Sequence, residues 1–300
     1  MDSSLTLLID AASLIYRAFF STPDTVRSED GTLMNAAYGF LSMLARLIAD
    51  HHPQYMACAA DDDWRPQWRV DLIDTYKTSR AADDSAQSEV EDQLEDQMPV
   101  IAEALSLSGI ALVGHAEYEA EDVIGTLAAR APGRVAIVSG DRDLFQLVRD
   151  PKVVVIYPRR GVSVVDRVDE AFIEAKYGIP GRLYLDFAIL RGDPSDGLPG
   201  VRGIGEKIAA SLVSRYGDLD SIIAAATSSP GGVALGKVRG AVDYIERARR
   251  VCTIPTDLPI ADTDLTRPSD VAAIALRALG KQYGISDPIE RLVTAIRAMS

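Results

Sequence analysis

Acidic residues follow directly on several apolar runs of this sequence. The runs have the length and composition of β-strands, and the carboxyl ends of parallel strands meet at one edge of a sheet. We therefore expect the side chains of these acids to lie close together at that edge. They are Asp10, the consecutive residues Asp61, Asp62 and Asp63, and the pair Asp141 and Asp143.

Further acids extend this set. Glu119, Glu121 and Asp122 stand where a helix is predicted to begin, and Asp193 and Asp196 lie in the segment Gly-Asp-Pro-Ser-Asp-Gly. A single aspartate of this kind is most often a helix cap or a turn residue. Many carboxylates at one edge, however, would repel each other strongly unless cations were bound. Oxygen ligands favour Mg²⁺ or Mn²⁺, and two such ions about 4 Å apart suit phosphodiester hydrolysis.

The elements that would position these acids alternate between strand and helix. This alternation indicates an α/β fold with a central, mostly parallel sheet and helices on both faces. After residue 157 helical patterns dominate, so we expect an α/β domain over 1–175 and a helical domain over 176–300. Strands are predicted at 5–10, 55–60, 109–113, 134–139 and 152–157, and helices at 36–49, 97–107, 120–131 and 144–148.

The composition is that of a folded protein from a reducing compartment. The chain has 300 residues, 47% hydrophobic and 25% charged, which excludes a disordered or fibrous protein. Cys58 and Cys252 form no disulfide or zinc pattern, and no apolar stretch spans a membrane, so we expect a cytoplasmic protein. The net charge of −13 opposes nonspecific coating of nucleic acid, but residues 201–250 are locally basic and suit a polyanion.

Two ordered motifs give the chain a specific resemblance. Residues 140–144, Gly-Asp-Arg-Asp-Leu, and residues 192–207, Gly-Asp-Pro-Ser-Asp-Gly-Leu-Pro-Gly-Val-Arg-Gly-Ile-Gly-Glu-Lys, are similar to motifs of the bacterial 5′-nuclease family. That family comprises flap endonucleases and the 5′→3′ exonuclease domain of DNA polymerase I. Shorter matches at 8–10, 16–19, 37–40, 68–69, 76–80 and 118–122 extend the resemblance over most of the chain.

The resemblance implies a stand-alone, structure-selective 5′ nuclease with a PIN-like fold. Such an enzyme acts as a 5′→3′ exonuclease and 5′-flap endonuclease in replication and repair, with two or more Mg²⁺ or Mn²⁺ ions per active site. Its expected substrates are DNA with 5′ flaps, nicks or recessed 5′ ends, with RNA-containing 5′ strands as a further candidate, and a monomer is expected. A helical arch would occupy about residues 70–98, and a helix-three-turn-helix motif about 186–220.

The resemblance also assigns metal ligands. Asp62 is preferred to Asp61 and Asp63 because its spacing to Arg69 and Tyr76 matches the family pattern. Most bacterial members have Asp at position 121, so Glu121 lengthens the reach of this ligand. One ion is placed on Asp10, Asp62, Glu119 and Glu121, and a second on Asp141, Asp143, Asp193 and the shared Glu121, with Asp122 and Asp196 bound through water.

Basic residues and glycines supply the expected contacts with DNA. Lys77 and Arg80 lie one helical turn apart and would steer the scissile phosphate, with Tyr76 stacking on a terminal base. The acidic run 83–96 departs from the basic arch of the family; it would weaken flap threading or is simply a solvated face. A helix-hairpin-helix turn would bind phosphate and, in the family, K⁺, although Gly197 replaces the usual Asn. The remaining expected DNA contacts are Arg17, Arg69, Gly200, Arg202, Gly203, Gly205 and Lys207.

Two other classes of protein are alternatives. A DNA-binding scaffold that has lost catalysis would be expected to lack Lys77 or one of the acids such as Asp141, and all are present. A phosphatase of the haloacid dehalogenase type places an Asp-x-Asp motif on its first strand and follows it with Thr, whereas Asp143 precedes Leu144. The sequence therefore favours the 5′ nuclease.

Overall fold

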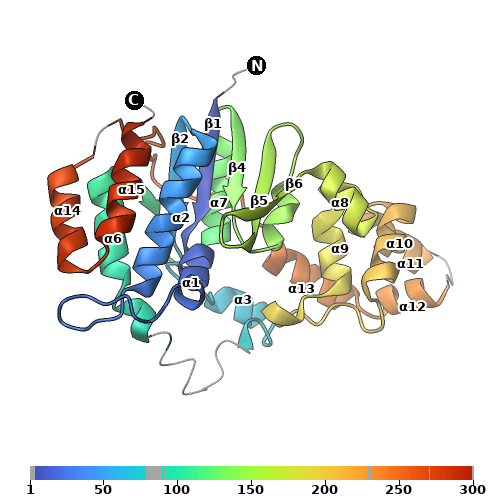
Figure 1. Ribbon diagram of the computed structural model, residues 1–300. Coiled ribbons are helices and arrows are strands. Elements are labelled where there is room, and N and C mark those ends of the chain that lie inside the picture. Colours follow the sequence, from blue (N-terminus) through green and yellow to red (C-terminus); the bar gives the residue numbers. More distant parts are fainter. Residues whose placement is uncertain (1–3, 79–89, 91, 229–231, 270, 299–300) are drawn as a thin grey trace.

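A six-stranded sheet forms the centre of the molecule (Figure 1). The computed structural model describes residues 4–78, 90, 92–228, 232–269 and 271–298. Within them the strands lie in the order β3, β2, β1, β4, β5, β6, and all neighbours are parallel except β5 and β6. The strands are β1 (Leu5–Asp10), β2 (Tyr55–Ala59), β3 (Leu112–Val113), β4 (Arg134–Val138), β5 (Val153–Arg160) and β6 (Val164–Val168).

The register of the three central strands brings their carboxyl ends together. Asp10, the last residue of β1, lies beside Ala59 of β2, and Ile9 lies beside Val138 of β4. The segments that follow β2 and β4 therefore start at the same edge as Asp10. Because parallel strands share one direction, the acids in these segments can converge there.

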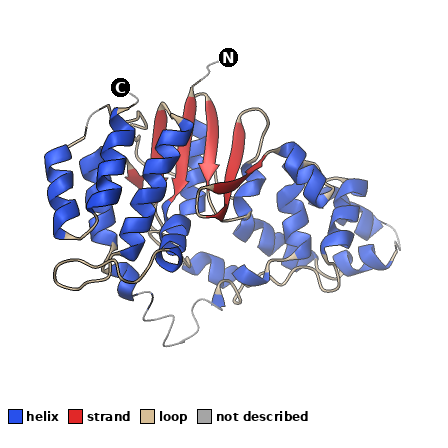
Figure 2. Cartoon of the chain, in the orientation of Figure 1, coloured by secondary structure: helices blue, strands red, loops and turns tan. Residues whose placement is uncertain are grey.

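Helices cover both faces of the sheet (Figure 2). Side chains alternate along β1, so Leu7 and Ile9 face one hydrophobic core and Leu8 faces the other. The core around Leu8 is covered by α7 (Ala120–Arg130) and continues into the helical region. The core around Leu7 is covered by α1 (Ala11–Ser21), α2 (Asn35–His51), α6 (Met98–Ser108), α14 (Ala273–Gln282) and α15 (Ser286–Arg297).

The helical region shares the core on the α7 side of the sheet. Leu190 and Ala248 belong to the same buried cluster as Val123 and Ile124 of α7. Three short 3-10 turns lie at Asp143–Leu147, Gly181–Leu183 and Pro194–Asp196. The helices on this side are α3 (Gln67–Leu72), α8 (Glu170–Tyr177), α9 (Tyr184–Arg191), α10 (Glu206–Tyr216), α11 (Leu219–Ser228), α12 (Val233–Arg239) and α13 (Val242–Cys252).

The structure confirms the α/β class, with helices on both faces of a mostly parallel sheet and an added helical region. The elements of the α/β part that were not predicted include α1, α3 and the antiparallel edge strand β6. The N-cap of α1 is Asp10, which the sequence analysis interpreted as a metal ligand at a strand end and not as the start of a helix. The helix expected at 144–148 is instead the 3-10 turn Asp143–Leu147.

The predicted domain boundary places the C-terminal helices in the helical domain of 176–300. In the structure they lie apart from the other helices of that domain. α14 and α15 pack against α6 and α2, on the opposite face of the sheet. The chain returns there beside β2, where the Met56 amide donates to the Leu265 carbonyl at 2.6 Å. The physical reason is the apolar face of α15, whose Leu292 and Ile296 are completely buried in that core.

None of the helices in the described ranges is long and apolar enough to cross a bilayer.

Candidate metal centre and DNA interface

A cleft of about 1000 Å³ opens where the carboxyl ends of β1, β2 and β4 meet. Side chains of α1, the start of α7 and the loops after β2 and β4 line it, together with parts of 94–101 and 193–196. The fold thus collects acids from distant parts of the sequence on one cavity. Of the predicted metal ligands, those that line the cleft are Asp10, Glu119, Glu121, Asp141, Asp193 and Asp196.

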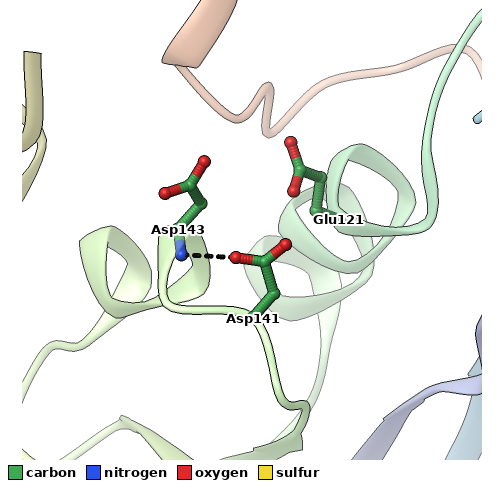
Figure 3. Close-up of side chains that lie close together, drawn as sticks. All are labelled: Glu121, Asp141 and Asp143. Carbon is green, nitrogen blue, oxygen red and sulfur yellow. Dashed lines mark hydrogen bonds between the residues drawn. The ribbon is translucent and has the colours of Figure 1, made fainter. Parts of the chain in front are cut away.

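Three acids lie closest to each other. One carboxylate oxygen each from Glu121, Asp141 and Asp143 lies within 4.8 Å of the others. Figure 3 shows these side chains converging from α7 and from the turn after β4, where the Asp143 amide donates to Asp141 Oδ1 at 2.8 Å. Burial, with the like charge of neighbouring acids, raises the pKa of Glu121 and of Asp143 well above the ordinary range. This crowded, oxygen-only set fits a hard divalent cation.

Asp10 lies at the centre of this edge and is 5% exposed. Its Oδ1 accepts a hydrogen bond from the Ser13 amide at 3.0 Å, which caps α1, and its Oδ2 accepts one from Ser139 Oγ. Ser139 Oγ in turn accepts from the Asp141 amide at 2.9 Å, so one serine joins the ends of β1 and β4. Burial raises the pKa of Asp10 to about 7, and the charges of Asp61 and Asp141 add to this effect. A cation bound here would displace a proton near neutral pH.

The structure places Asp61 in the cleft and Asp62 outside it, which corrects the choice made from spacing. Asp61 lines the cleft, and its Oδ1 accepts a hydrogen bond from the Ala120 amide at 2.6 Å. Asp62 is exposed and lies against Gly114, where an added Cβ would come within 2.1 Å of a carboxylate oxygen of Asp62. The spacing to Arg69 runs through a loop, and the length of a loop does not fix which side chain faces the cleft.

Arg69 is completely buried, so the predicted DNA contact is wrong. Its guanidinium donates to Glu119 and to Asp122, each at 2.7 Å, and lies 3.6 Å from Glu121. Its Nε donates to the carbonyl of Val251 in α13 at 3.1 Å. A side chain with 0% exposure and four such partners does not reach a phosphate at the surface. Arg69 instead holds the first turn of α7, which carries three of the predicted ligands.

Tyr76 and Lys77 also point inward, toward Glu119. The Tyr76 hydroxyl donates to Glu119 at 2.6 Å and the residue is 3% exposed, so the predicted stacking of Tyr76 on a base is wrong. Lys77 pairs with the other oxygen of Glu119, yet it also lines the cleft. Its amide donates to the Asp196 carbonyl at 2.9 Å, and its φ of +48° lies in the left-handed region, which is costly for lysine.

Arg80, predicted to act beside Lys77, lies outside the described residues, as do the acidic positions 83, 84, 89 and 91 of the expected arch. The part of this segment that the structure describes lines the cleft with Leu94, Glu95 and Met98. One wall of the cleft is therefore largely apolar at this point.

Arg17 lies on α1 and lines the cleft, as expected of a phosphate contact. Its guanidinium sits beside Gly140, where an added Cβ would come within 2.9 Å of Nη2. Its Nε is buried and has no hydrogen-bond partner in the described part of the chain. Tyr16 and Phe20, one helical turn apart on α1, are 48% and 61% exposed with ring centroids 4.9 Å apart. This aromatic pair also lines the cleft, and the sequence signal that reveals it is the spacing of four residues.

The glycine-rich turn exposes most of its expected DNA contacts. Arg202, Gly203, Gly205 and Lys207 all lie at the surface. The helix α10 begins directly after Gly205, which acts as its N-cap without a side-chain hydrogen bond. The Ile208 amide already donates to the Gly205 carbonyl at 3.0 Å, but the amides of the exposed residues Glu206 and Lys207 precede the first helical bond and offer a suitable place for a phosphate.

Gly200 differs from the rest of the turn, because it is buried. Its φ is +68°, in the left-handed region. Its amide faces the protein interior, where it donates to the Tyr244 hydroxyl at 2.9 Å. An added Cβ would come within 2.5 Å of the Arg191 carbonyl oxygen. Gly200 is therefore a glycine required by close packing, and the predicted contact of Gly200 with DNA is wrong.

Two arginines that the sequence analysis did not single out flank Asp193. Arg142 and Arg191 lie 3.7 and 3.6 Å from its Oδ2, and the Ser195 amide donates to its Oδ1 at 3.0 Å. Arg142 also lines the cleft. Its place between Asp141 and Asp143 is the signal that reveals it, since the turn that carries two ligands carries this side chain too.

Comparisons with known proteins agree over the whole chain. The model of the 5′-3′ exonuclease N-terminal resolvase-like domain matches residues 5–178, and that of the 5′-3′ exonuclease C-terminal SAM fold matches residues 179–271. A 5′-3′ exonuclease of Streptomyces coelicolor is 46% identical over 97% of this chain and 100% of its own length. A 5′-3′ exonuclease of Mycobacterium tuberculosis is 42% identical over 99% of this chain and 98% of its own length.

A solved structure gives the same fold. The flap endonuclease of bacteriophage T5, in a complex with DNA and metal ions, matches with a TM-score of 0.68 and 16% identity over 98% of both chains. At this identity the similarity bears on the fold alone, whereas the family models and the close relatives bear on the family. The chain therefore belongs to the 5′-3′ exonuclease family, a family of metal-dependent DNA nucleases.

Proposed function

We propose that this chain is a structure-selective 5′ nuclease that cuts DNA at 5′ flaps, nicks and recessed 5′ ends with two bound divalent cations. The observation that supports this most is the convergence of carboxylates from separate segments on one cleft. Single acids cap local turns, as Asp10 caps α1, but capping does not account for the gathering of acids from β1, α7 and the loops after β2 and β4 on one cleft. Mutual repulsion among them is relieved by cations of the Mg²⁺ or Mn²⁺ type.

The proposed ligands are the carboxylates that line the cleft or belong to its closest group. Asp61 takes the place first given to Asp62, and Asp122, completely buried against Arg69, orients α7 instead of binding an ion directly. Bound Mg²⁺ or Mn²⁺ would supply positive charge for the scissile phosphate and lower the pKa of water. One ion is assigned to Asp10, Asp61, Glu119 and Glu121, and the second to Asp141, Asp143, Asp193 and the shared Glu121, with Asp196 acting through water.

Other groups of the chain would hold the DNA around this centre. The exposed start of α10, with Arg202 and Lys207, suits the phosphates of a duplex. Arg17, whose Nε has no hydrogen-bond partner among the described residues, lies beside the exposed rings of Tyr16 and Phe20, a combination that suits the backbone and bases of a single strand. Together, a duplex site and a single-strand site match a substrate at a junction of the two.

Finer features extend the proposal. Action on RNA-containing 5′ strands, a monomeric state and a cytoplasmic location stay predictions. So does K⁺ in the glycine-rich turn, where Lys237 already donates to the Gly203 carbonyl at 2.8 Å. The glycine at position 197 has a local cause, because an added Cβ would come within 1.8 Å of the Thr75 carbonyl oxygen.

Cleavage of three substrates tests the proposed function. A 5′-labelled flap, a nicked duplex and a single strand are each incubated with Mg²⁺, Mn²⁺ or a chelator. We expect metal-dependent cuts at the flap junction, weaker cutting of the single strand and none with the chelator. Binding of the flap without cleavage under either ion would favour the DNA-binding scaffold instead.

Substituting the two neighbouring aspartates separately tests the ligand assignment. Asp61→Asn is expected to slow single-turnover cleavage by about a hundredfold, because it removes a charge from the cleft. Asparagine keeps an oxygen for the Ala120 amide, so the start of α7 stays in place. Asp62→Asn is the matched control and is expected to stay within about twofold of the unmodified chain. The reverse order of effects would restore Asp62 as the ligand.

A further inference from the structure

The helix α13 makes hydrogen bonds to two parts of the chain that contact proposed metal ligands or their neighbours. Near its beginning, the Tyr244 hydroxyl accepts the hydrogen bond of the Gly200 amide at 2.9 Å. In its last turn, the Val251 carbonyl accepts a hydrogen bond from Arg69 Nε at 3.1 Å. One helix of 11 residues thus touches the glycine-rich turn at one end and the buried arginine of the acid cluster at the other.

The Gly200 end is linked to Asp193. Gly200 lies so close to residues 191–192 that an added Cβ would come within 2.5 Å of the Arg191 carbonyl oxygen. The Asp193 amide follows directly and donates to the Leu198 carbonyl at 3.0 Å, which closes the loop. The exposed residues of the turn, Arg202, Gly203 and 205–207, follow Gly200 in the chain, whereas Asp193 precedes it. A duplex on this turn is therefore joined through a few backbone atoms to a proposed ligand.

The Arg69 end is linked to Glu119. The guanidinium donates to Glu119 and Asp122 at 2.7 Å each, and the Glu119 amide donates to the other oxygen of Asp122 at 3.0 Å. These bonds fix the first turn of α7 with a two-pronged geometry that only arginine provides. A second bond, from Arg247 to the Leu72 carbonyl at 3.0 Å, joins α13 to α3, the helix that carries Arg69.

We propose that Tyr244 and Arg69 are positioning residues that act through α13. They keep Asp193 and Glu119, which are assigned to different ions, at their working separation when a duplex binds the glycine-rich turn. This inference rests on the proposed function, since it takes both acids as ligands. Positioning of this kind affects the rate of bound substrate more than the affinity for it, because a shift of about 1 Å in a reacting centre costs up to about a hundredfold.

Tyr244→Phe tests the inference with the loss of one hydroxyl. The saturating single-turnover rate on a flap substrate is expected to fall about five- to tenfold, the equivalent of one hydrogen bond, with the Kd for DNA within about twofold. Calorimetric titration of the DNA-free chain with Mn²⁺ is expected to show severalfold weaker binding. Tyr283→Phe, beyond the end of α14, is the matched control and is expected to change neither quantity. A higher Kd with an unchanged saturating rate would make Tyr244 a DNA-binding residue and overturn the inference.

Arg69→Lys tests the other end of α13. Lysine keeps the charge but not the fork, so we expect the saturating rate to fall by about a hundredfold. The double variant with Tyr244→Phe is expected to be about as slow as Arg69→Lys alone, because both residues act through one helix. If the rate of the double variant fell by the product of the two single effects, this result would overturn the coupling through α13. If Arg69→Lys does not fold, as circular dichroism would show, Tyr244→Phe alone decides.

The failures of the two proposals are distinguishable. An unmodified chain that binds flap DNA but never cuts it with Mg²⁺ or Mn²⁺ overturns the proposed function. An unmodified chain that cuts, with Tyr244→Phe as fast and as tightly bound to Mn²⁺, overturns only the role of α13.

Discussion

Replacing Asp141 by asparagine is expected to lower metal-dependent cleavage by about a thousandfold or more, while DNA binding stays measurable. Asp141 is one of the three acids whose oxygens lie within 4.8 Å of each other, and it also lines the cleft, so it would face a cation bound there. Asparagine removes the charge but keeps Oδ1, the acceptor of the Asp143 amide at 2.8 Å. The turn can keep its shape, and the loss would report on the cation instead of the fold.

The measurements that check this are single-turnover cleavage of the flap, the Kd for flap DNA with chelator, and calorimetric titration with Mn²⁺. Asp287→Asn, at the exposed start of α15, is the matched control and is expected to match the unmodified chain in all three. Cleavage by Asp141→Asn within a few-fold of the control would remove Asp141 from the ligands and weaken the two-cation proposal.

The position of the acids at the sheet edge was predictable because strand direction alone gathers them. Alternation, unlike spacing, disfavours Asp62 in the run 61–63, and of the two remaining acids Asp61 is the one nearer to the end of β2. Ala57 and Ala59 of β2 face the α7 side of the sheet, and Asp61 continues that alternation. The same alternation relates Leu8 to Asp10 and Ile137 to Asp141, because the members of each pair are an even number of residues apart. The number of residues between two motifs gives no such geometric information when a loop separates them.

The inward direction of the basic and aromatic residues was not predictable from their own segment. Arginine is almost never fully buried unless it is paired, so an exposed Arg69 was the default expectation. Its burial depends on the carbonyl of Val251, 182 residues away in the sequence, and on acids of α7. Tyr76 is buried for the same reason, through Glu119. Short motifs identify such residues without stating whether they meet the substrate or the protein.

Lys77→Ala is expected to lower the saturating single-turnover rate on a flap by about a hundred- to a thousandfold, with a change of only a few-fold in the Kd for DNA. Although burial alone would lower it, the carboxylates of Glu119 and Glu121 raise the pKa of Lys77 above its usual range, so the ammonium stays charged beside the cleft. The fold should survive, because Glu119 keeps Arg69 and Tyr76 as partners. Alanine also meets the same left-handed backbone as lysine does, which adds no new strain.

Two outcomes separate the roles open to this lysine. Lys152→Ala, an exposed lysine before β5, is the matched control, and Lys77→Met keeps the length of the chain without the charge. A slow reaction in both Lys77 variants, with Mn²⁺ binding unchanged, would mean that the ammonium acts on the DNA during cleavage. An unchanged rate with tighter Mn²⁺ binding would instead make Lys77 a counterion that competes with the metal for Glu119. A slow reaction in both variants is expected if the Lys77 ammonium turns to the phosphate in the cleft that it lines. An unchanged rate is expected if the pair between Lys77 and Glu119 persists during cleavage.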